Sequence, residues 1–342
     1  MLNIMAQIYG IDLSMEKFDV SFIDSESKLN HMVVKNDVRS ISKFLHQLPQ
    51  NALLCAEYTG VYGDLLLFMA DASDTSISYV PGYTIKHSLG IQRGKSDPID
   101  ANRIREYGER FKDKLILSHF VSENMYELKE LHRTRKTFID SRKRLKTVIK
   151  GENRKPFISL SAHHSRMKEM ESLDEQISQL EQEIALLIGQ DEEMSKNHSY
   201  VTSVVGVGDV TANELIIKTE NFKKIRDAKA CAEFAGIAPH PYSSGTMDKG
   251  NRISHMGDKQ LKSLLFMCGR SAVENNKEIR LYFERKYTIE KKPYFLVMNN
   301  VANKMVKIIF TLVNKQTEFD RDYIQKDPRE NMDKEHVKEK AN

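Results

Sequence analysis

The feature that most constrains the fold is a change in the spacing of apolar residues near Ser122. Before this point the apolar residues alternate or run in short pieces, which is typical of β-strands. After it, Leu131, Phe138 and Leu145 recur every seven residues, which is typical of a long helix that packs along a second helix. The sequence therefore predicts a first part built on a sheet and a later part built on helices.

The first part is expected to be an α/β domain over residues 1–120 with a mixed sheet. Its strands are predicted at residues 6–14, 17–24, 30–35, 52–56 and 76–80, the first three connected as hairpins. Asp37 is expected to cap the first helix, and further helices are predicted at residues 61–70 and 97–111. The predicted order is β-β-β-α-β-α-β-α, with the helices on the faces of the sheet.

A helical arm is expected over residues 121–198. Its second half carries a stripe of apolar residues at alternating steps of three and four: Met170, Leu173, Ile177, Leu180, Ile184 and Leu187. Two arrangements remain open for this stripe. It can pack in a helical hairpin folded back on its own domain, or it can pair two copies of the chain as a coiled coil, which is the interpretation we favour.

A mostly helical C-terminal domain is expected over residues 199–313, with helices at residues 227–235, 258–273, 279–285 and 294–313. The turn around Gly206 and Gly208 resembles that of a helix-hairpin-helix, in which backbone amides face a phosphate, although a tight interhelical turn explains the glycines equally well. The tail over residues 314–342 is charged and poor in apolar residues, so we expect it to be disordered.

Basic residues gather in one predicted helix of the arm, although the net charge of the whole chain is only +4. A solvated helix face is one explanation, and a surface that follows nucleic-acid phosphates is the other. The residues that would contact phosphates are Arg133, Arg135, Lys136, Arg142, Lys143 and Arg144.

Composition excludes several other classes of protein. No window approaches eighteen consecutive apolar residues, so a membrane span is not expected. The first residues show no secretory signal, and Cys55, Cys231 and Cys268 form no CxxC pair, which argues against a zinc module or a disulfide framework. A reducing cytoplasm fits these observations.

Four carboxylates are the first candidate for chemistry. Asp12 lies within an apolar strand, Glu57 ends a buried strand, and Asp97 and Asp100 share one face of a helix start. If they converge they repel one another unless a cation neutralises them, and an all-oxygen set suits Mg²⁺. Strand-Asp, strand-Glu and helix-Asp is the pattern expected of an RNase H-like phosphoryl-transfer site.

Each carboxylate except Asp12 also has a purely structural explanation. Glu57 can cap the helix that begins near Gly60, and Asp97 can be the N-cap of its helix with Pro98 at the first helical position. An unpaired aspartate in an apolar strand is harder to explain, because its burial costs several kcal/mol.

The second candidate is the glycine-punctuated stretch from Pro241 to Arg252, which carries Ser243 and Ser244. By itself it reads as a flexible polar turn. A serine hydroxyl is a weak nucleophile that needs activation, and Lys249 and Arg252 could stabilise charge on a phosphate.

Taken together, these residues resemble one family, the DEDD transposases of insertion sequences (the insertion-sequence 110 family). Asp12, Glu57, Asp97 and Asp100 are similar to its acidic signature. The segment at residues 235–245, with its serine before glycine, and the helix entry at residues 252–261 resemble its C-terminal domain. The resemblance spans about residues 6–290 and departs in Met247-Asp248, which is less basic than that pattern leads us to expect.

The resemblance implies a RuvC-like N-terminal domain whose four carboxylates bind Mg²⁺. It implies that Ser244 attacks a DNA phosphodiester to form a covalent phosphoserine, with Ser243 as the alternative nucleophile. It also implies donor and target DNA, a guiding bridge RNA, and a homo-oligomer with composite active sites. Two other functions remain open: a RuvC-like Mg²⁺-dependent junction nuclease or resolvase, and a nucleic-acid-binding protein without enzymatic activity.

Overall fold

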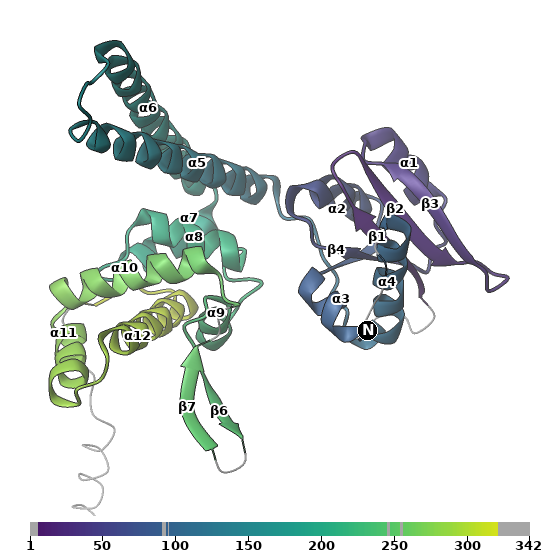
Figure 1. Ribbon diagram of the computed structural model, residues 1–342. Coiled ribbons are helices and arrows are strands. Elements are labelled where there is room, and N and C mark those ends of the chain that lie inside the picture. Colours follow the sequence, from purple (N-terminus) through teal and green to yellow (C-terminus); the bar gives the residue numbers. More distant parts are fainter. Residues whose placement is uncertain (1–5, 91–93, 95, 245–246, 254–255, 321–342) are drawn as a thin grey trace, which may run out of the picture. The chain divides into compact units, whose positions relative to one another are not determined.

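The computed structural model describes residues 6–90, 94, 96–244, 247–253 and 256–320. The chain divides into two compact units, Met1–Ser122 and Glu123–Asn342 (Figure 1). The expected arm therefore belongs to the same unit as the C-terminal helices, and the expected boundary between residues 198 and 199 falls inside a helix.

Unit 1 is built on a five-stranded mixed sheet in the order β3-β2-β1-β4-β5. β1, β2 and β3 pair antiparallel, whereas β4 pairs parallel with both β1 and β5. The predicted α/β domain with three hairpin-connected strands is confirmed. The strands are β1 Gln7–Leu13, β2 Lys17–Ile23, β3 Leu29–Lys35, β4 Ala52–Glu57 and β5 Ser76–Val80.

The helices of unit 1 follow the predicted order, with one addition at α3 that the sequence analysis did not predict. Asp37 caps α1 by accepting a hydrogen bond from the Ser40 amide, as expected. The bounds are α1 Val38–His46, η1 Gly60–Gly63, α2 Asp64–Ala72, α3 Gly82–Ser88, α4 Asp97–Arg110 and η2 Lys112–Lys114.

The two faces of the sheet bury separate apolar clusters because successive side chains of a strand point to opposite faces. Tyr9 and Ile11 of β1 pack with α1 and α2 on one face. Ile8 of the same strand packs on the other face with α3 and α4 (Figure 1). The sheet is therefore covered by helices on both sides, as the sequence predicts.

Gly10 lets α4 lie directly on β1. A Cβ built on Gly10 would come within 2.3 Å of both the Ala101 carbonyl oxygen and the Arg105 amide nitrogen. From the helix side, a Cβ built on Gly108 would come within 2.8 Å of the Ile8 side chain. These close approaches fix the axis of α4 across the middle of the sheet, and with it the position of its first turn.

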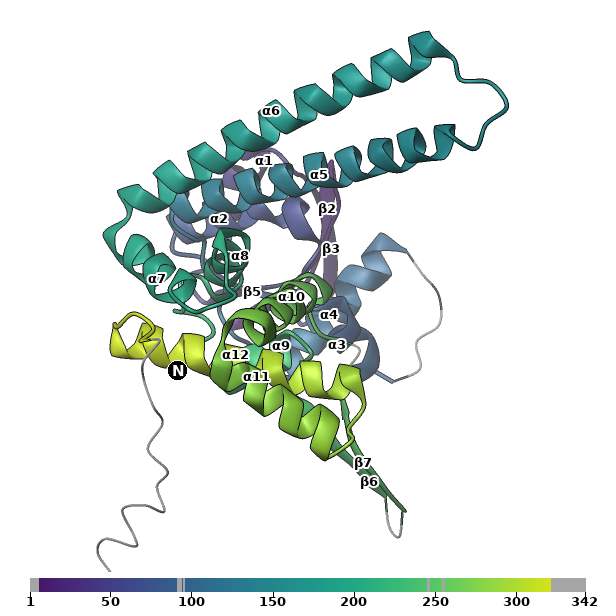
Figure 2. The ribbon, with the colours of Figure 1, turned by 90° about the vertical axis from the view of Figure 1, so that its left-hand side faces the viewer.

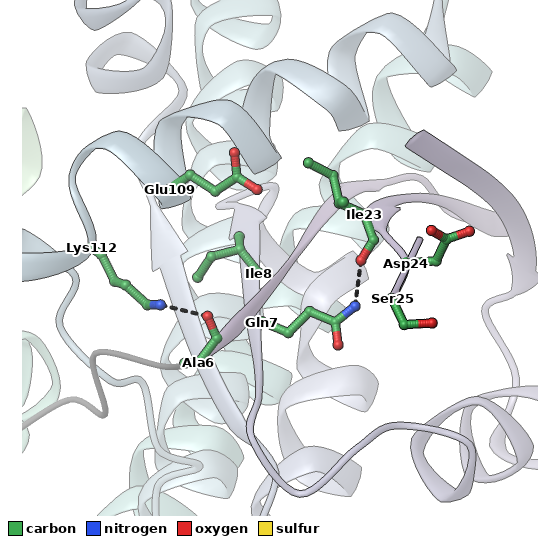
Figure 3. A pocket seen from close by; sticks show the side chains of 8 residues that line it. All are labelled: Ala6, Gln7, Ile8, Ile23, Asp24, Ser25, Glu109 and Lys112. Carbon is green, nitrogen blue, oxygen red and sulfur yellow. Dashed lines mark hydrogen bonds between the residues drawn. The ribbon is translucent and has the colours of Figure 1, made fainter. Parts of the chain in front are cut away.

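A pocket opens at the start of β1, at the end of that strand farther from Asp12 (Figure 3). Its polar groups are used within the chain: Gln7 Nε2 donates to the Ile23 carbonyl, and Lys112 Nζ donates to the Ala6 carbonyl. We therefore assign it a structural role at the base of the sheet.

Unit 2 begins with two long helices, α5 Glu123–Glu152 and α6 Leu160–Gln190, which pack along each other as an antiparallel hairpin (Figure 2). Leu173, Ile177, Ile184 and Leu187 of the apolar stripe are buried within this one chain. Arg135 pairs with Glu181 at 2.6 Å and Arg142 with Asp174 at 2.5 Å across the two helices. The stripe thus adopts the helical-hairpin arrangement, and our preference for a coiled coil between two copies is corrected, because α5 covers these side chains.

The base of the arm is held by a buried polar contact. His132 Nε2 of α5 lies 2.8 Å from Glu214 Oε2 of α8, and Gln260 donates to the same oxygen at 2.9 Å. Both His132 and Glu214 are buried. The arm is therefore tied to the helices that follow it in the chain.

The rest of unit 2 is mostly helical, and the four helices predicted there are confirmed. No residue range was predicted for α7, α8 or η3, and the two-stranded antiparallel sheet of β6 and β7 was not predicted. The bounds are α7 Glu192–Thr202, α8 Asp209–Thr219, α9 Ala228–Phe234, β6 Pro239–Ser244, β7 Met247–Ile253, α10 Lys259–Asn275, α11 Lys277–Glu284, η3 Arg285–Ile289 and α12 Tyr294–Lys315.

α12 forms the centre of this unit. Among the described helices it alone is long and apolar enough to cross a membrane by length and composition, but more than half of its most apolar stretch is buried inside the protein. Val297, Val301, Val306 and Ile309 are fully covered. These are the properties of a core helix. The tail beyond Asp320 lies outside the described residues.

Candidate active site

Asp12 and Glu57 lie side by side at one edge of the sheet. β1 and β4 are parallel neighbours whose register ends with Ile11 opposite Ala56, so the next residue of each strand is the carboxylate. Asp12 points to the α4 face, because it follows Gly10 by two residues in the same strand. The sheet thus brings two of the four predicted carboxylates to the same edge.

The other two come from the first turn of α4. Asp97 is the first residue of the helix and Asp100 lies one turn later; Ser96, rather than Asp97, occupies the N-cap position. The structural explanation of Asp97 as the N-cap is therefore wrong by one residue. Because Gly10 holds α4 against β1, this first turn lies beside Asp12.

Burial and the neighbouring carboxylates both act on the pKa of Asp12. Burial, followed by repulsion from Asp100, Glu57, Asp97 and Asp19, raises the pKa of Asp12 to about 6. Within the described part of the chain, no lysine, arginine or histidine lies within ion-pair distance of Asp12. Asp12 is thus influenced by the other three predicted carboxylates and by Asp19, and its ionised form is disfavoured.

A fifth carboxylate was missed by the sequence analysis. Asp19 on β2 is the direct cross-strand partner of Asp12 and is buried. It lies 3.1 Å from Lys17 Nζ and 2.8 Å from His31 Nε2. The tight turn between the two strands could have revealed it, since pairing Leu13 with Phe18 places Asp19 opposite Asp12.

Most of the carboxylates are held by groups of the protein. Lys17 pairs with Asp97 at 3.1 Å and Arg103 with Asp100 at 2.7 Å. Glu57 extends over α3, where a Cβ on Gly82 would lie 2.0 Å from Glu57 Oε1. Accordingly, no three His, Cys, Asp or Glu side chains of the described residues are grouped closely enough to hold a metal ion in this conformation. The donors themselves are all carboxylate oxygens, which fit Mg²⁺.

Ser244 is the last residue of β6, in a hairpin that projects from the helices of unit 2 (Figures 1 and 2). The backbone register sets Ser244 opposite Met247 and Ser243 opposite Asp248, while Arg252 is opposite His240. Lys249 lies on β7. The predicted turn is thus a β-hairpin with the two serines next to its tip; Gly245 and Thr246 lie outside the described residues.

The base of this hairpin is closely packed. A Cβ on Gly257 would come within 2.4 Å of the Gly236 backbone, and the Asp258 amide donates to the Phe234 carbonyl at 2.8 Å. The chain segments that enter and leave the hairpin are therefore fixed to each other, whereas β6 pairs with β7 alone in its sheet.

The predicted phosphate-binding residues of α5 fall into two groups. Arg135 and Arg142 form the ion pairs to α6 and serve the arm itself. Lys136, Lys143 and Arg144 are exposed, and Arg133 is exposed beside Glu130. The exposed group leaves a basic surface on the side of α5 that does not face α6.

The two glycines of the predicted phosphate-binding turn differ in role. Gly206 has φ +97°, and a Cβ there would lie 2.7 Å from the Ala272 amide nitrogen, so it serves close packing on α10. Gly208 is the N-cap of α8 and has open space around it. The next residue, Asp209, places a negative charge in the first turn of α8, where a bound phosphate would lie. The tight-turn explanation therefore accounts for Gly206.

Comparison with known proteins identifies a transposase family over both candidate regions. A transposase model for the DEDD group of IS110 matches residues 9–151, a range that includes all four carboxylates. A second model, described as transposase IS116/IS110/IS902 family, matches residues 198–284, a range that includes the serine hairpin. The chain belongs to the IS110 family of transposases.

Relatives of this IS110-family chain include proteins of matching length. Pilin gene-inverting proteins of Moraxella lacunata and Moraxella bovis are each 26% identical to it, over 93% of this chain and 99% of theirs. The transposase for insertion sequence element IS1328 of Yersinia enterocolitica is 24% identical, over 68% of this chain and 75% of its own. The first matched region covers most of unit 1 with α5, and the second runs from the end of α7 to the end of α11 and includes the hairpin of β6 and β7.

Proposed function

We propose that this IS110-family transposase cuts and rejoins DNA through the Ser244 hydroxyl, with Asp12, Glu57, Asp97 and Asp100 holding Mg²⁺. The observation that carries the proposal is the gathering of four carboxylates around Asp12, whose pKa rises to about 6. Carboxylates that repel one another at a sheet edge are stabilised when a cation neutralises them. The match of this region to a DEDD transposase model supports the same role.

An RNase H-like fold for unit 1 is part of the proposal. One line of support is the strand order β3-β2-β1-β4-β5, in which the first two pairs of neighbours are antiparallel and the last two are parallel. The other is the presence of carboxylates on the central strand β1, on its neighbour β4 and on the covering helix α4. When bound, Mg²⁺ would neutralise charge on the phosphate. The protein's part is to hold Asp12 and Glu57 at the ends of adjacent strands and to keep Asp97 and Asp100 on a helix fixed by Gly10.

In the proposed reaction, Ser244 Oγ attacks the phosphorus of a DNA phosphodiester. The hydroxyl gives up its proton as the Oγ–P bond forms, and the departing deoxyribose oxygen gains a proton as the old P–O bond breaks. A deoxyribose hydroxyl of a second DNA end then attacks the phosphoserine, which rejoins the DNA and restores the serine. Lys249 and Arg252 on the neighbouring strand would stabilise the phosphate charge.

The proposed partners are donor and target DNA, a guiding bridge RNA and further copies of the chain. The exposed Lys136, Lys143 and Arg144 of α5 support a backbone-contacting surface for nucleic acid. Resemblance to the family supports the guide RNA and a site composed from two subunits. Under this proposal base pairing selects the sequence, and the protein reads shape and phosphates.

The deciding experiment is to trap the covalent intermediate with DNA carrying the element ends, Mg²⁺ and the guide RNA. Ser244→Ala is expected to abolish both strand cleavage and the protein–DNA adduct while leaving RNA binding unchanged. Ser243→Ala, one residue away on the same strand, is the matched control and is expected to retain the adduct. The adduct should be located by mass spectrometry on the peptide that contains Ser244.

An adduct that persists in Ser244→Ala and disappears in Ser243→Ala would move the nucleophile by one residue. Cleavage without any adduct in either variant would favour a RuvC-like nuclease, in which the carboxylates cut and the hairpin binds DNA. Salt-dependent binding without cleavage would favour a binding protein without enzymatic activity.

A second candidate outcome of the same chemistry is DNA inversion. It is favoured by the two Moraxella relatives, named pilin gene-inverting proteins, which match this chain over nearly their whole length. On a plasmid with two inverted target sites, an invertase exchanges the ends within one molecule, whereas a transposase inserts the element elsewhere. The recombination products formed on this plasmid distinguish the two.

A further inference from the structure

Lys17, the first residue of β2, lies at the edge of the sheet where the carboxylates gather, here called the acidic edge (Asp12, Asp19, Glu57, Asp97 and Asp100). Its ammonium nitrogen lies 3.1 Å from Asp19 Oδ2 and 3.1 Å from Asp97 Oδ2. It therefore links β2 to the first turn of α4, across the edge where Asp12 lies.

The ammonium group is held there by a fixed partner. The side chain of Asp19 is 4% exposed, and its second oxygen lies 2.8 Å from His31 Nε2 on β3. Asp19 is also the direct cross-strand partner of Asp12. The buried Asp19 carboxylate, which pairs with both His31 and Lys17, thus positions the Lys17 ammonium group beside Asp97. The Lys17 side chain itself is 44% exposed and has room to move.

This arrangement bears on the proposed metal site. Asp97 is one of the four carboxylates proposed to hold Mg²⁺, and one of its oxygens is already engaged by Lys17. A lysine ammonium is a compact charge on a flexible stem, so it can neutralise a carboxylate and still withdraw from it. A single positive charge partly offsets the repulsion among the carboxylates, and a divalent cation would replace it.

We propose that Lys17 is an internal counterion of the acidic edge, which occupies Asp97 in the metal-free protein and must be displaced before Mg²⁺ binds. The inference rests on the proposed metal site. It assigns Lys17 the role of raising the metal concentration at which the site fills. Asp19 and His31 serve as the anchor that returns the ammonium group to Asp97 when the metal leaves.

The test uses the full-length chain and Mn²⁺ alone, with free Mn²⁺ measured by its electron paramagnetic resonance signal. Lys17→Met keeps the length of the side chain and removes its charge. Loss of the ammonium group that pairs with Asp97 leaves this carboxylate free for the metal, so Mn²⁺ binding is expected to tighten by about threefold to tenfold. Lys28→Met is the matched control, because Lys28 pairs with Glu26 in the turn between β2 and β3 and its loss should leave the affinity unchanged.

Three results would contradict the role of Lys17. Equal Mn²⁺ affinity in wild type and Lys17→Met would show that Lys17 does not compete with metal. Weaker binding in Lys17→Met would make Lys17 a structural link that holds α4 in place. An equal gain in Lys28→Met would reduce the effect to overall charge.

Asp12→Asn separates this inference from the proposed function. Loss of Mn²⁺ binding in Asp12→Asn, together with tighter binding in Lys17→Met, supports both. Binding in wild type that Asp12→Asn leaves intact would overturn the proposed metal site and the role of Lys17 with it. Loss of Mn²⁺ binding in Asp12→Asn, together with equal affinity in wild type and Lys17→Met, would overturn the role of Lys17 alone.

Discussion

At the scale of single residues, the raised pKa of Asp12 shows that the acidic edge lowers the stability of the native state. The Asp12 carboxyl is partly buried and is repelled by four other carboxylates, so its ionised form is disfavoured in the native state. In the unfolded chain the same group has its ordinary pKa of 3.8. Between these two values the native protein holds a proton that the unfolded chain has lost, and folding is correspondingly favoured at the acidic end of that range.

We therefore predict that the metal-free protein loses stability as the pH rises from about 4 to 6, by on the order of 1 kcal/mol after allowance for solvent screening. Asp12→Asn should remove this loss and be more stable than wild type at neutral pH. Urea unfolding in EDTA at several pH values measures it. Asp24→Asn is the control: backbone hydrogen bonds from Lys28 and Glu26 lower the pKa of Asp24, so its contribution has the opposite sign. A pH profile of Asp12→Asn parallel to wild type would contradict the prediction.

The sequence was sufficient to select the four carboxylates, because an aspartate in an apolar strand has few structural explanations. It did not reveal Asp19, Lys17 or His31. Their importance depends on strand register, since Asp19 gains its meaning from lying opposite Asp12. Register across a hairpin is set by the geometry of the turn, which apolar periodicity does not specify.

At the scale of elements, α4 determines the geometry of the site. It carries Asp97 and Asp100, and its backbone approaches β1 at Gly10 with no side chain between them. Any added atom at Gly10 must push the helix away from the strand, because its nearest neighbours are backbone atoms.

Gly10→Ala is therefore predicted to destabilise unit 1 by about 2–4 kcal/mol, as expected for overpacking with backbone displacement. It should also weaken metal binding, since the helix start moves away from Asp12. Thermal unfolding and Mn²⁺ titration measure the two effects. Gly151→Ala, in α5 with nothing within 4 Å, is the control and should be neutral or stabilising by up to about 1 kcal/mol. A Gly10→Ala protein with wild-type stability would contradict the close contact.

Elements with a clear hydrophobic period were predicted well, and the exceptions have physical reasons. The five strands of unit 1 and the helices α9, α10, α11 and α12 lie within a few residues of their predicted bounds. β6 was missed because its sequence, Pro-His-Pro-Tyr-Ser-Ser, lacks alternating apolar residues. Proline is tolerated there because a two-stranded ribbon has an open edge on each strand. The partner of the apolar stripe in α6 could not be read from periodicity, which is the same for a hairpin and for a dimer.

At the scale of the whole molecule, the chain separates its candidate chemistry into two folded units. The carboxylates belong to Met1–Ser122, and the serine hairpin and basic arm belong to Glu123–Asn342. Nucleic acid that contacts the arm is expected to do so through exposed charges, whereas charges used between α5 and α6 maintain the arm.

Replacing Lys136, Lys143 and Arg144 together by glutamine is predicted to weaken nucleic-acid binding and to lower the dependence of log affinity on log salt by about two to three. Fluorescence anisotropy across a salt series measures the slope. Arg135→Gln is the matched control, because Arg135 pairs with Glu181: it should lower thermal stability and leave the slope unchanged. A wild-type salt dependence in the triple variant would show that these three side chains do not contact nucleic acid.

The contact between Gly10 and α4 has one further consequence. It joins main chain to main chain, so the relative position of Asp12, Asp97 and Asp100 does not depend on which apolar side chains fill the surrounding layers. Substitutions confined to those layers are therefore expected to leave the acidic residues in place, whereas a side chain at residue 10 displaces them.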